Sequence, residues 1–211
     1  TEVVINAYEE WGKDCVHKFN GMFAFAIWDV MKRELFIARD RYGIIPVYYY
    51  YKNDVFLFGS EIKSILQHPD VSVSVSIPAL NEYFSFQNIF SDLTLFQDIK
   101  LLPAANTLTV KGVSIQTKQY WDFHFEEDNA LTKQDCIEEL TRLFEQAVRR
   151  QHVSDVEIGS YLSGGMDSGS VTSITANNFE NLKTFTCGFD LSSATGLELG
   201  FDEREKAEFL S

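Results

Sequence analysis

The sequence predicts a mixed, mostly antiparallel α+β domain followed by the opening of an α/β domain with a parallel sheet. Residues 21–60 alternate apolar and polar side chains with a period of two, which is typical of antiparallel strands joined by turns. Residues 123–131 are acidic, lack a repeating pattern and are expected to form a linker. After them, a strand, a helix and a second strand follow in the order of a parallel βαβ unit.

The strands of the first domain, residues 1–122, are expected in two groups. The period-two segments between residues 21 and 60 predict one antiparallel meander, and their many aromatic side chains indicate that one face packs on another layer. Residues 106–121 predict a two-strand hairpin that turns at Lys111 and Gly112.

Three helices are expected in the same domain. A helical spacing of apolar residues opens the chain over residues 1–12. A short helix is predicted to begin at a Ser60 cap and to stop at Pro69. Another carries Pro78 in its first turn, where a missing N–H group is tolerated.

The second domain, residues 132–211, begins with a predicted helix. Thr132 and Asp135 have the spacing of an N-terminal cap, and apolar residues from Ile137 to Val148 share one face of the helix. Residues 156–162 and 183–189 predict two parallel strands, and residues 169–176 predict the helix that joins them.

Composition excludes several classes of function. The net charge is −13, from 18 basic and 31 acidic residues, without a Lys/Arg-rich block, so we expect no nucleic-acid partner. The chain has three cysteines, at Cys15, Cys136 and Cys187, which predicts reduced thiols in a cytoplasmic protein. Neither a membrane span nor a secretory signal is predicted. A start at Thr1 and an end within a helical pattern indicate a piece of a longer chain.

The strongest motif is the loop Ser163-Gly164-Gly165-Met166-Asp167-Ser168, between the first predicted strand and its helix. Ligands of parallel sheets collect at the carboxyl ends of the strands, and helix N-termini attract anions. The glycines let backbone N–H groups approach a phosphate, and the serines add hydroxyl groups. A carboxylate at Asp167 would repel bare phosphate, so we expect a bridging Mg²⁺. The motif therefore predicts a site for a magnesium polyphosphate.

Three other interpretations of the loop make different demands on the sequence. A Walker A loop needs a lysine after its glycines, and this loop has none. A nucleophile elbow with the spacing G-x-D-x-G needs a later histidine, but all four histidines come earlier in the chain. A plain glycine-serine turn, with Asp167 acting only as a helix cap, stays open.

Longer stretches carry a family resemblance. The segments SDVEIGSYLSGGMDSGSV, NGMFAFAIWD, ARDRYGIIPVYYY, FGSEIKSIL, FQDIKLLPAANTLTV, QYWDF and GFDEREKAEFLS occur in this order. Together they resemble the glutamine-dependent asparagine synthetases. The resemblance implies a partial αββα N-terminal-nucleophile glutaminase fold, followed by the start of an ATP-pyrophosphatase domain. It also implies glutamine and aspartate as substrates, and conversion of aspartate, ATP and glutamine to asparagine, AMP, pyrophosphate and glutamate through a β-aspartyl-adenylate.

The resemblance also implies roles for individual residues. Ser163, Gly164, Gly165 and Ser168 would hold the β- and γ-phosphates of ATP, and Asp167 would bind Mg²⁺. Cys187 would pack its backbone against the adenine.

No catalytic residue is assigned in this chain. The family's nucleophilic cysteine would precede Thr1, and Cys15 lies within a helix-like segment. An N-terminal threonine can act as a nucleophile, but Thr1 aligns with an interior helix of the family. We therefore expect the 211 residues to be inactive by themselves.

Two alternatives for the function stay open. Residues 189–203 look like an insertion and indicate a relative that amidates another carboxylate, such as a sugar acid or a peptide. The second alternative is a non-catalytic interaction module. A homodimer is also left open.

Overall fold

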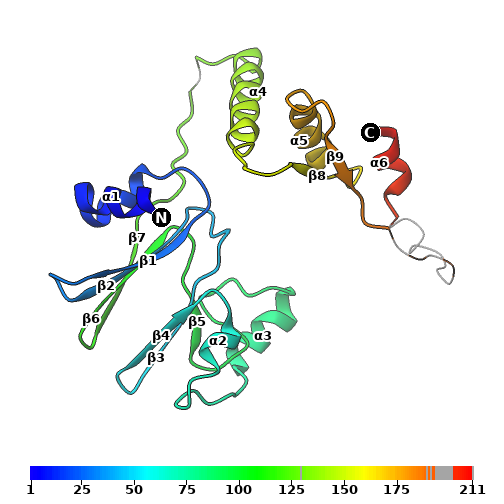
Figure 1. The fold of residues 1–211 in the computed structure, drawn as a ribbon. Coiled ribbons are helices and arrows are strands. Elements are labelled where there is room, and N and C mark those ends of the chain that lie inside the picture. The colour runs from blue at the N-terminus through cyan, green and yellow to red at the C-terminus, as the bar shows by residue number, and fades with distance from the viewer. Residues whose placement is uncertain (129, 189, 191, 193–201, 211) are drawn as a thin grey trace. The chain divides into compact units, whose positions relative to one another are not determined.

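The computed structural model describes residues 1–128, 130–188, 190, 192 and 202–210 (Figure 1). They form two compact units, Thr1–Phe125 and Glu126–Ser211. No helix in the described ranges is both long and apolar enough to span a lipid bilayer.

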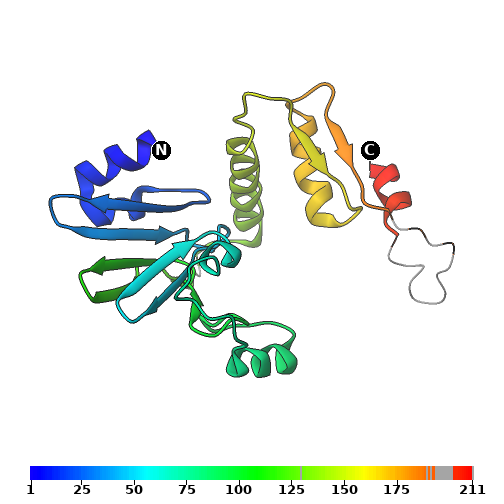
Figure 2. The same cartoon turned by 60° about the horizontal axis from the view of Figure 1, so that its bottom comes forward.

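The first unit contains two antiparallel sheets with helices on their outer faces (Figure 2). The strand order is β1-β2-β6-β7 in one sheet and β4-β3-β5 in the other. In chain order its elements are α1 (Glu2–Trp11), η1 (Gly12–Lys18), β1 (Ala24–Asp29), β2 (Glu34–Arg39), β3 (Tyr48–Lys52), β4 (Val55–Gly59), α2 (Ile62–Ile65), α3 (Ile77–Phe86), β5 (Ile99–Leu101), β6 (Asn106–Lys111) and β7 (Ser114–Gln119).

Alternation along β2 determines how the layers pack. Phe36 and Ala38 point to one face of the sheet and lie in a cluster with Ala7 of α1 and Cys15 of η1. Ile37 lies between them and points to the opposite face, because successive side chains of a strand alternate. All three β2 residues are at most 1% exposed, so this strand is buried on both faces.

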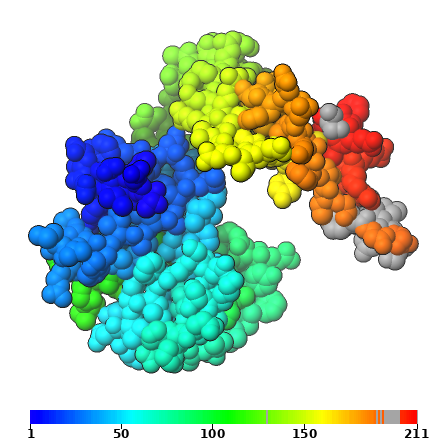
Figure 3. Space-filling view, in the orientation of Figure 1, coloured from blue at the N-terminus to red at the C-terminus, as the bar shows by residue number. Residues whose placement is uncertain are grey.

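The second sheet packs against the Ile37 face. Ile37 and Leu108 cluster with Val47 and with the inner side chains Tyr49 and Phe56 of the second sheet. On the outer side of that sheet, Tyr50 and Ile99 pack on Ile65 of α2 and on Val71. The layers of this unit are therefore helix, sheet, sheet and helix. In the space-filling view, the segment from β3 through α3 (cyan to green) forms one continuous surface (Figure 3).

The single meander expected over residues 21–60 is wrong. β1 and β2 form one hairpin and β3 and β4 another, and the two hairpins belong to different sheets. β2 pairs instead with β6, with Leu35 opposite Val110.

The connection at residues 40–47 explains this separation. The Asp40 carboxylate accepts hydrogen bonds from the amides of Tyr42, Ile44 and Ile45, at 3.1, 3.0 and 3.1 Å. The Arg39 guanidinium donates to carbonyl oxygens of the same connection. A backbone whose donors are used in this way cannot continue a strand ladder.

Other predicted elements are confirmed or shifted. α3 begins after Ser76, whose hydroxyl accepts from the Ala79 amide at 3.4 Å, and a proline lies in its first turn as expected. α2 is shorter than predicted, and its N-cap is Glu61, not Ser60. The β6–β7 hairpin pairs Lys111 with Ser114, so its turn lies one residue later than expected.

The second unit contains the expected βαβ order. Strand β8 pairs with β9 in parallel, with Ser160 opposite Thr184. The predicted cap of the long helix is confirmed, because the Thr132 hydroxyl accepts from the Asp135 amide at 3.2 Å and the Asp135 carboxylate accepts from the Thr132 amide at 2.9 Å. Phe189, the expected end of the second strand, and most of the insertion-like segment 189–203 lie outside the described residues. The elements are α4 (Lys133–Arg150), β8 (Gly159–Tyr161), α5 (Met166–Ala176), β9 (Lys183–Phe185) and α6 (Arg204–Leu210).

The apolar face predicted for α4 is only partly buried. Val148 near its C-terminal end is 8% exposed, whereas Ile137, Leu140 and Phe144 are between 39% and 69% exposed. Among the described residues, this helix therefore packs mainly through its last turns.

Candidate functional site

The loop at residues 162–165 leaves the sheet at the carboxyl ends of both parallel strands. The Leu162 amide donates to the Phe185 carbonyl at 3.0 Å, and the Thr186 hydroxyl donates to the Leu162 carbonyl at 2.7 Å. These bonds continue the β8–β9 pairing past the last strand residues. The start of the loop is therefore held in place by both strands, at the sheet edge where ligands of parallel sheets collect.

The two serines of the loop bind each other. Ser163 Oγ lies 2.9 Å from Ser168 Oγ, and the Ser163 amide donates to Ser168 Oγ at 3.1 Å. The Gly165 amide donates to Ser163 Oγ at 3.4 Å, and Ser168 Oγ donates to the Gly165 carbonyl at 3.2 Å. The hydroxyls that were expected to hold phosphates therefore close the loop on itself in this structure.

Among the described residues, unpaired amides lie at Gly164 and at the start of α5. Gly165 is the N-cap of this 11-residue helix and supplies no side-chain cap. Within the described part of the chain, the amides of Met166, Asp167 and Ser168 have no protein acceptor. Such amides, together with the helix dipole, favour a negatively charged ligand.

Asp167 lies on the second residue of α5 and is exposed. Its carboxylate accepts no hydrogen bond from any described residue, so the interpretation of Asp167 as a helix cap is wrong. The described residues also contain no cluster of three or more His, Cys, Asp or Glu side chains that could enclose a metal ion. A single carboxylate fits Mg²⁺ only as one ligand among phosphate oxygens and water, which is the usual way Mg²⁺ binds with nucleotides.

The glycines of the loop serve different purposes. Gly164 has φ +74°, which L side chains rarely adopt, and a Cβ there would lie 2.5 Å from Cβ of Lys206 in α6. At Gly165 a Cβ would meet only Ser163 Oγ, at 3.3 Å. Gly164 therefore allows close packing of α6. Gly165 has no side chain to cover the backbone beside the amides of α5, so a ligand can approach there.

Cys187 lies two residues after β9 and is an exposed free thiol. It follows the same strand edge as the loop, because the two strands are parallel. Its contact with adenine stays a prediction.

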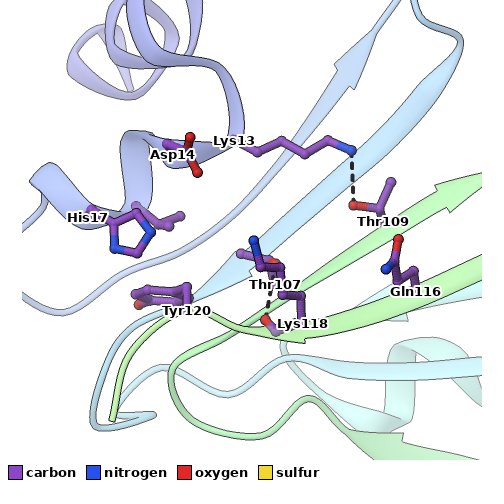
Figure 4. A pocket seen from close by; sticks show the side chains of 9 residues that line it. Lys13, Asp14, His17, Thr107, Thr109, Gln116, Lys118 and Tyr120 are labelled. Carbon is purple, nitrogen blue, oxygen red and sulfur yellow. Dashed lines mark hydrogen bonds between the residues drawn. The ribbon is translucent and has the colours of Figure 1, made fainter. Parts of the chain in front are cut away.

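Two cavities of the molecule contain none of the predicted site residues. One, of about 420 Å³, lies between α4, β8 and α5 and is mostly apolar. The other, of about 100 Å³, lies between η1 and strands β6 and β7 (Figure 4). There Lys13 Nζ donates to Thr109 Oγ1 at 3.3 Å and pairs with Glu34 at 3.0 Å, and the Thr107 hydroxyl donates to the Lys118 carbonyl at 3.2 Å. These contacts join η1 to strands β2 and β6, and β6 to β7.

Comparison with known proteins finds a family model that matches part of each unit. The family model described as "Glutamine amidotransferase domain" matches residues 1–121, more than half of the chain. The chain belongs to the glutamine amidotransferase domain family. A second model, described as "Asparagine synthase", matches residues 139–211 of this amidotransferase-family chain.

The amidotransferase-family chain is similar to named synthetases. It is 41% identical to asparagine synthetase (glutamine-hydrolyzing) 3 of Bacillus subtilis, over 85% of this chain and 29% of that protein. It is 34% identical to putative asparagine synthetase (glutamine-hydrolyzing) 2 of Methanocaldococcus jannaschii, over 90% of this chain and 38% of that protein. Amidase chyE of Penicillium rubens is 28% identical over 91% of this chain and 31% of its own length.

These findings confirm the resemblance inferred from the sequence. The chain spans about a third of the length of the relatives it matches, as the shares of 29% and 38% indicate. One neighbour of the loop was missed by sequence reasoning, namely Lys206. It lies 42 positions after Gly164 (206 − 164) in a helical pattern typical of a solvated surface, so nothing in the sequence indicated the contact.

Proposed function

We propose that residues 132–210 bind MgATP at the Ser163–Ser168 loop, as part of a glutamine-dependent synthetase that activates a carboxylate. The observation that carries the proposal is the position of three unpaired amides at the start of α5, beside the Asp167 carboxylate. The match to the asparagine synthase family supports the same assignment.

Each loop residue has a separate part in this proposal. The amides of Met166 and Ser168 would donate to the phosphates, and the Ser163–Ser168 pair would keep the loop in the shape that exposes these amides. Asp167 would hold Mg²⁺, which neutralises the charge of the polyphosphate when it is bound. Cys187 would pack its backbone on the adenine.

The chemistry explains why ATP is needed. A carboxylate is a poor electrophile, and its attack on the α-phosphorus of ATP forms an acyl-adenylate and releases pyrophosphate. Ammonia, which the amidotransferase unit's family obtains from glutamine, then displaces AMP. We propose aspartate as the acceptor, with β-aspartyl-adenylate as the intermediate, because the relatives with the higher identities are named asparagine synthetases.

A second candidate is amidation of a different carboxylate. The similarity to amidase chyE, a protein with a different name from the synthetases, favours it. The two candidates are separated by measuring pyrophosphate release with aspartate and with other carboxylates. The measurement needs a protein as long as the relatives. Release that depends on aspartate supports the first candidate, and release that depends on another acid supports the second.

Calorimetric titration of the 211-residue chain with MgATP tests the nucleotide site. We expect binding that requires Mg²⁺, and Asp167→Asn should weaken it about tenfold, since charged contacts contribute on the order of 1.5–3 kcal/mol. Asp155→Asn, an exposed carboxylate between α4 and β8, is the matched control and should bind like the wild type. Equal affinity in Asp167→Asn and the wild type would refute the role of Asp167, and no binding in the wild type would refute the site.

A further inference from the structure

Three glycines of the second unit pack against α6. A Cβ at Gly164 would lie 2.5 Å from Lys206 Cβ, one at Gly169 would lie 3.3 Å from Leu210 Cδ1, and one at Gly188 would lie 2.6 Å from Arg204 Cδ. Gly164 and Gly169 flank the start of α5, and Gly188 follows β9. Helix α6 therefore lies directly on the loop and on the strand edge beside it.

The packing of α6 brings the stem of Lys206 onto the loop. Its neighbour Ala207 is 2% exposed and anchors the helix, whereas Lys206 itself is exposed. A lysine has a flexible four-carbon stem, so the ammonium group of a lysine whose Cβ rests on Gly164 has the length to reach across the loop.

Lys206 is the basic group in this region whose charge is not already paired. Arg204 donates from Nε to Asp202 at 2.9 Å and forms an ion pair with it, and these hydrogen bonds hold the pKa of the Asp202 carboxyl below its usual range. Lys206 has no ion pair with any residue that the structure describes. Its charge is therefore available to a ligand.

A cation beside this loop would favour the binding of a polyphosphate. Residues 163–170 contain no lysine or arginine, and their one charged side chain, Asp167, repels phosphate until a metal ion is bound. In a Walker A loop the lysine that contacts the β- and γ-phosphates follows the glycines directly. Here the lysine comes from a separate helix that packs on the first glycine.

We infer that Lys206 binds the triphosphate of a nucleotide held at the Ser163–Ser168 loop. The inference rests on the proposed function and adds a binding residue to that site. It also gives the Gly164 contact a role beyond packing, since this contact places the Lys206 Cβ on the residue two positions before α5.

The test compares Lys206→Met, Lys206→Arg and Lys183→Met in the 211-residue chain by calorimetric titration. Methionine keeps most of the stem that packs on Gly164 and removes the charge. Lys183→Met makes the same change at the amino end of β9, opposite the loop, where the ion pair with Glu157 is exposed and contributes little. Each variant is titrated with MgATP, with magnesium tripolyphosphate and with adenosine.

Lys206→Met is expected to bind MgATP and tripolyphosphate about tenfold more weakly, with adenosine changed less than about twofold. Lys206→Arg should recover most of the affinity, and Lys183→Met should bind like the wild type. Wild-type affinity in Lys206→Met, or an equal loss for adenosine, would overturn the role of Lys206 while leaving the nucleotide site intact. If the wild type binds no MgATP, the proposed function and this inference both fall. Circular dichroism of each variant checks that the helices are retained.

Discussion

Ser163 Oγ and Ser168 Oγ lie 2.9 Å apart and connect the two ends of the loop between β8 and α5. Ser168 Oγ also accepts from the Ser163 amide and donates to the Gly165 carbonyl. A hydroxyl has one hydrogen to donate, so Ser168 cannot serve all these partners and a phosphate at once. The serines therefore act first on the shape of the loop, and through it on the amides of α5.

Replacing Ser168 by alanine is expected to loosen the loop. The change removes an acceptor for the Ser163 amide and should lower the free energy of unfolding by about 1 kcal/mol, the typical net value of such hydrogen bonds. Circular dichroism in urea measures this, because α4, α5 and α6 provide much of the helical signal.

The control for this change is Ser173→Ala, an exposed serine on the same helix whose side chain bonds no described residue. We expect no change in its unfolding midpoint. An equal effect in both variants would show that loss of any hydroxyl on α5, and not the link to Ser163, is responsible.

The place of the candidate site could be predicted from the sequence, but its internal bonding could not. Ser163 and Ser168 bracket the glycines after a strand, and that order locates the loop. Which partner a hydroxyl chooses depends on rotamers and on the local curvature of the chain, and neither is visible in the residue pattern. Lys206 was missed for a related reason, because its contact with Gly164 depends on tertiary packing.

Gly164→Ala should lower the stability of the second unit more than a glycine-to-alanine change at a position without a close neighbour. A left-handed φ costs a non-glycine residue roughly 1–2 kcal/mol, and the contact with Lys206 Cβ adds an overpacking cost of about the same size. We expect the free energy of unfolding of the second unit to fall by about 3 kcal/mol.

Gly112→Ala is its matched control. Gly112 has φ +57° but no atom within 4 Å of a Cβ, so it reports the backbone cost alone. If both variants lose the same stability, each measured on its own unit, the contact between Gly164 and α6 does not exist in solution.

The fold was predicted best where the pattern is local. Period-two alternation located the strands, and Thr132 with Asp135 located the start of α4. The assignment of the hairpins to two sheets could not be predicted, since it depends on pairings such as Leu35 with Val110, far apart in the sequence. The bonds of Asp40 that interrupt the ladder look like an ordinary charged turn in the sequence.

Arg39→Met is expected to destabilise the first unit strongly. The Arg39 guanidinium is buried and donates to the carbonyls of Gly43, Ile45 and Leu102, which would lose their partners. The expected loss is about 3 kcal/mol or more, given 1.5–3 kcal/mol for a hydrogen bond to a charged group. Tryptophan fluorescence in urea measures it specifically, because all three tryptophans lie in the first unit.

The exposed Arg33 provides the control for that measurement. Arg33→Met removes the same charge from the turn after β1, where no described residue bonds the side chain, and should change the midpoint little. A loss in Arg39→Met no larger than in Arg33→Met would contradict the role given to the three carbonyl contacts.

The raised pKa of Tyr120 predicts that the first unit loses stability at alkaline pH. Burial, and then the charge of Asp40, raise the pKa of its hydroxyl from 10.0 to about 12, and the hydroxyl donates to the Arg39 carbonyl at 2.9 Å. Because the folded state holds this proton more tightly than the unfolded state, the stability that the Tyr120 proton contributes is complete below pH 10 and disappears as the pH rises towards 12.

Burial also raises the pKa of Tyr8 and Tyr49, so Tyr120→Phe should remove only part of the decline in urea midpoint between these pH values. Tyr51→Phe, which removes an exposed hydroxyl bonded to the Val113 carbonyl, should keep the wild-type profile. An unchanged decline in Tyr120→Phe would show that this hydroxyl titrates equally in the folded and unfolded chains.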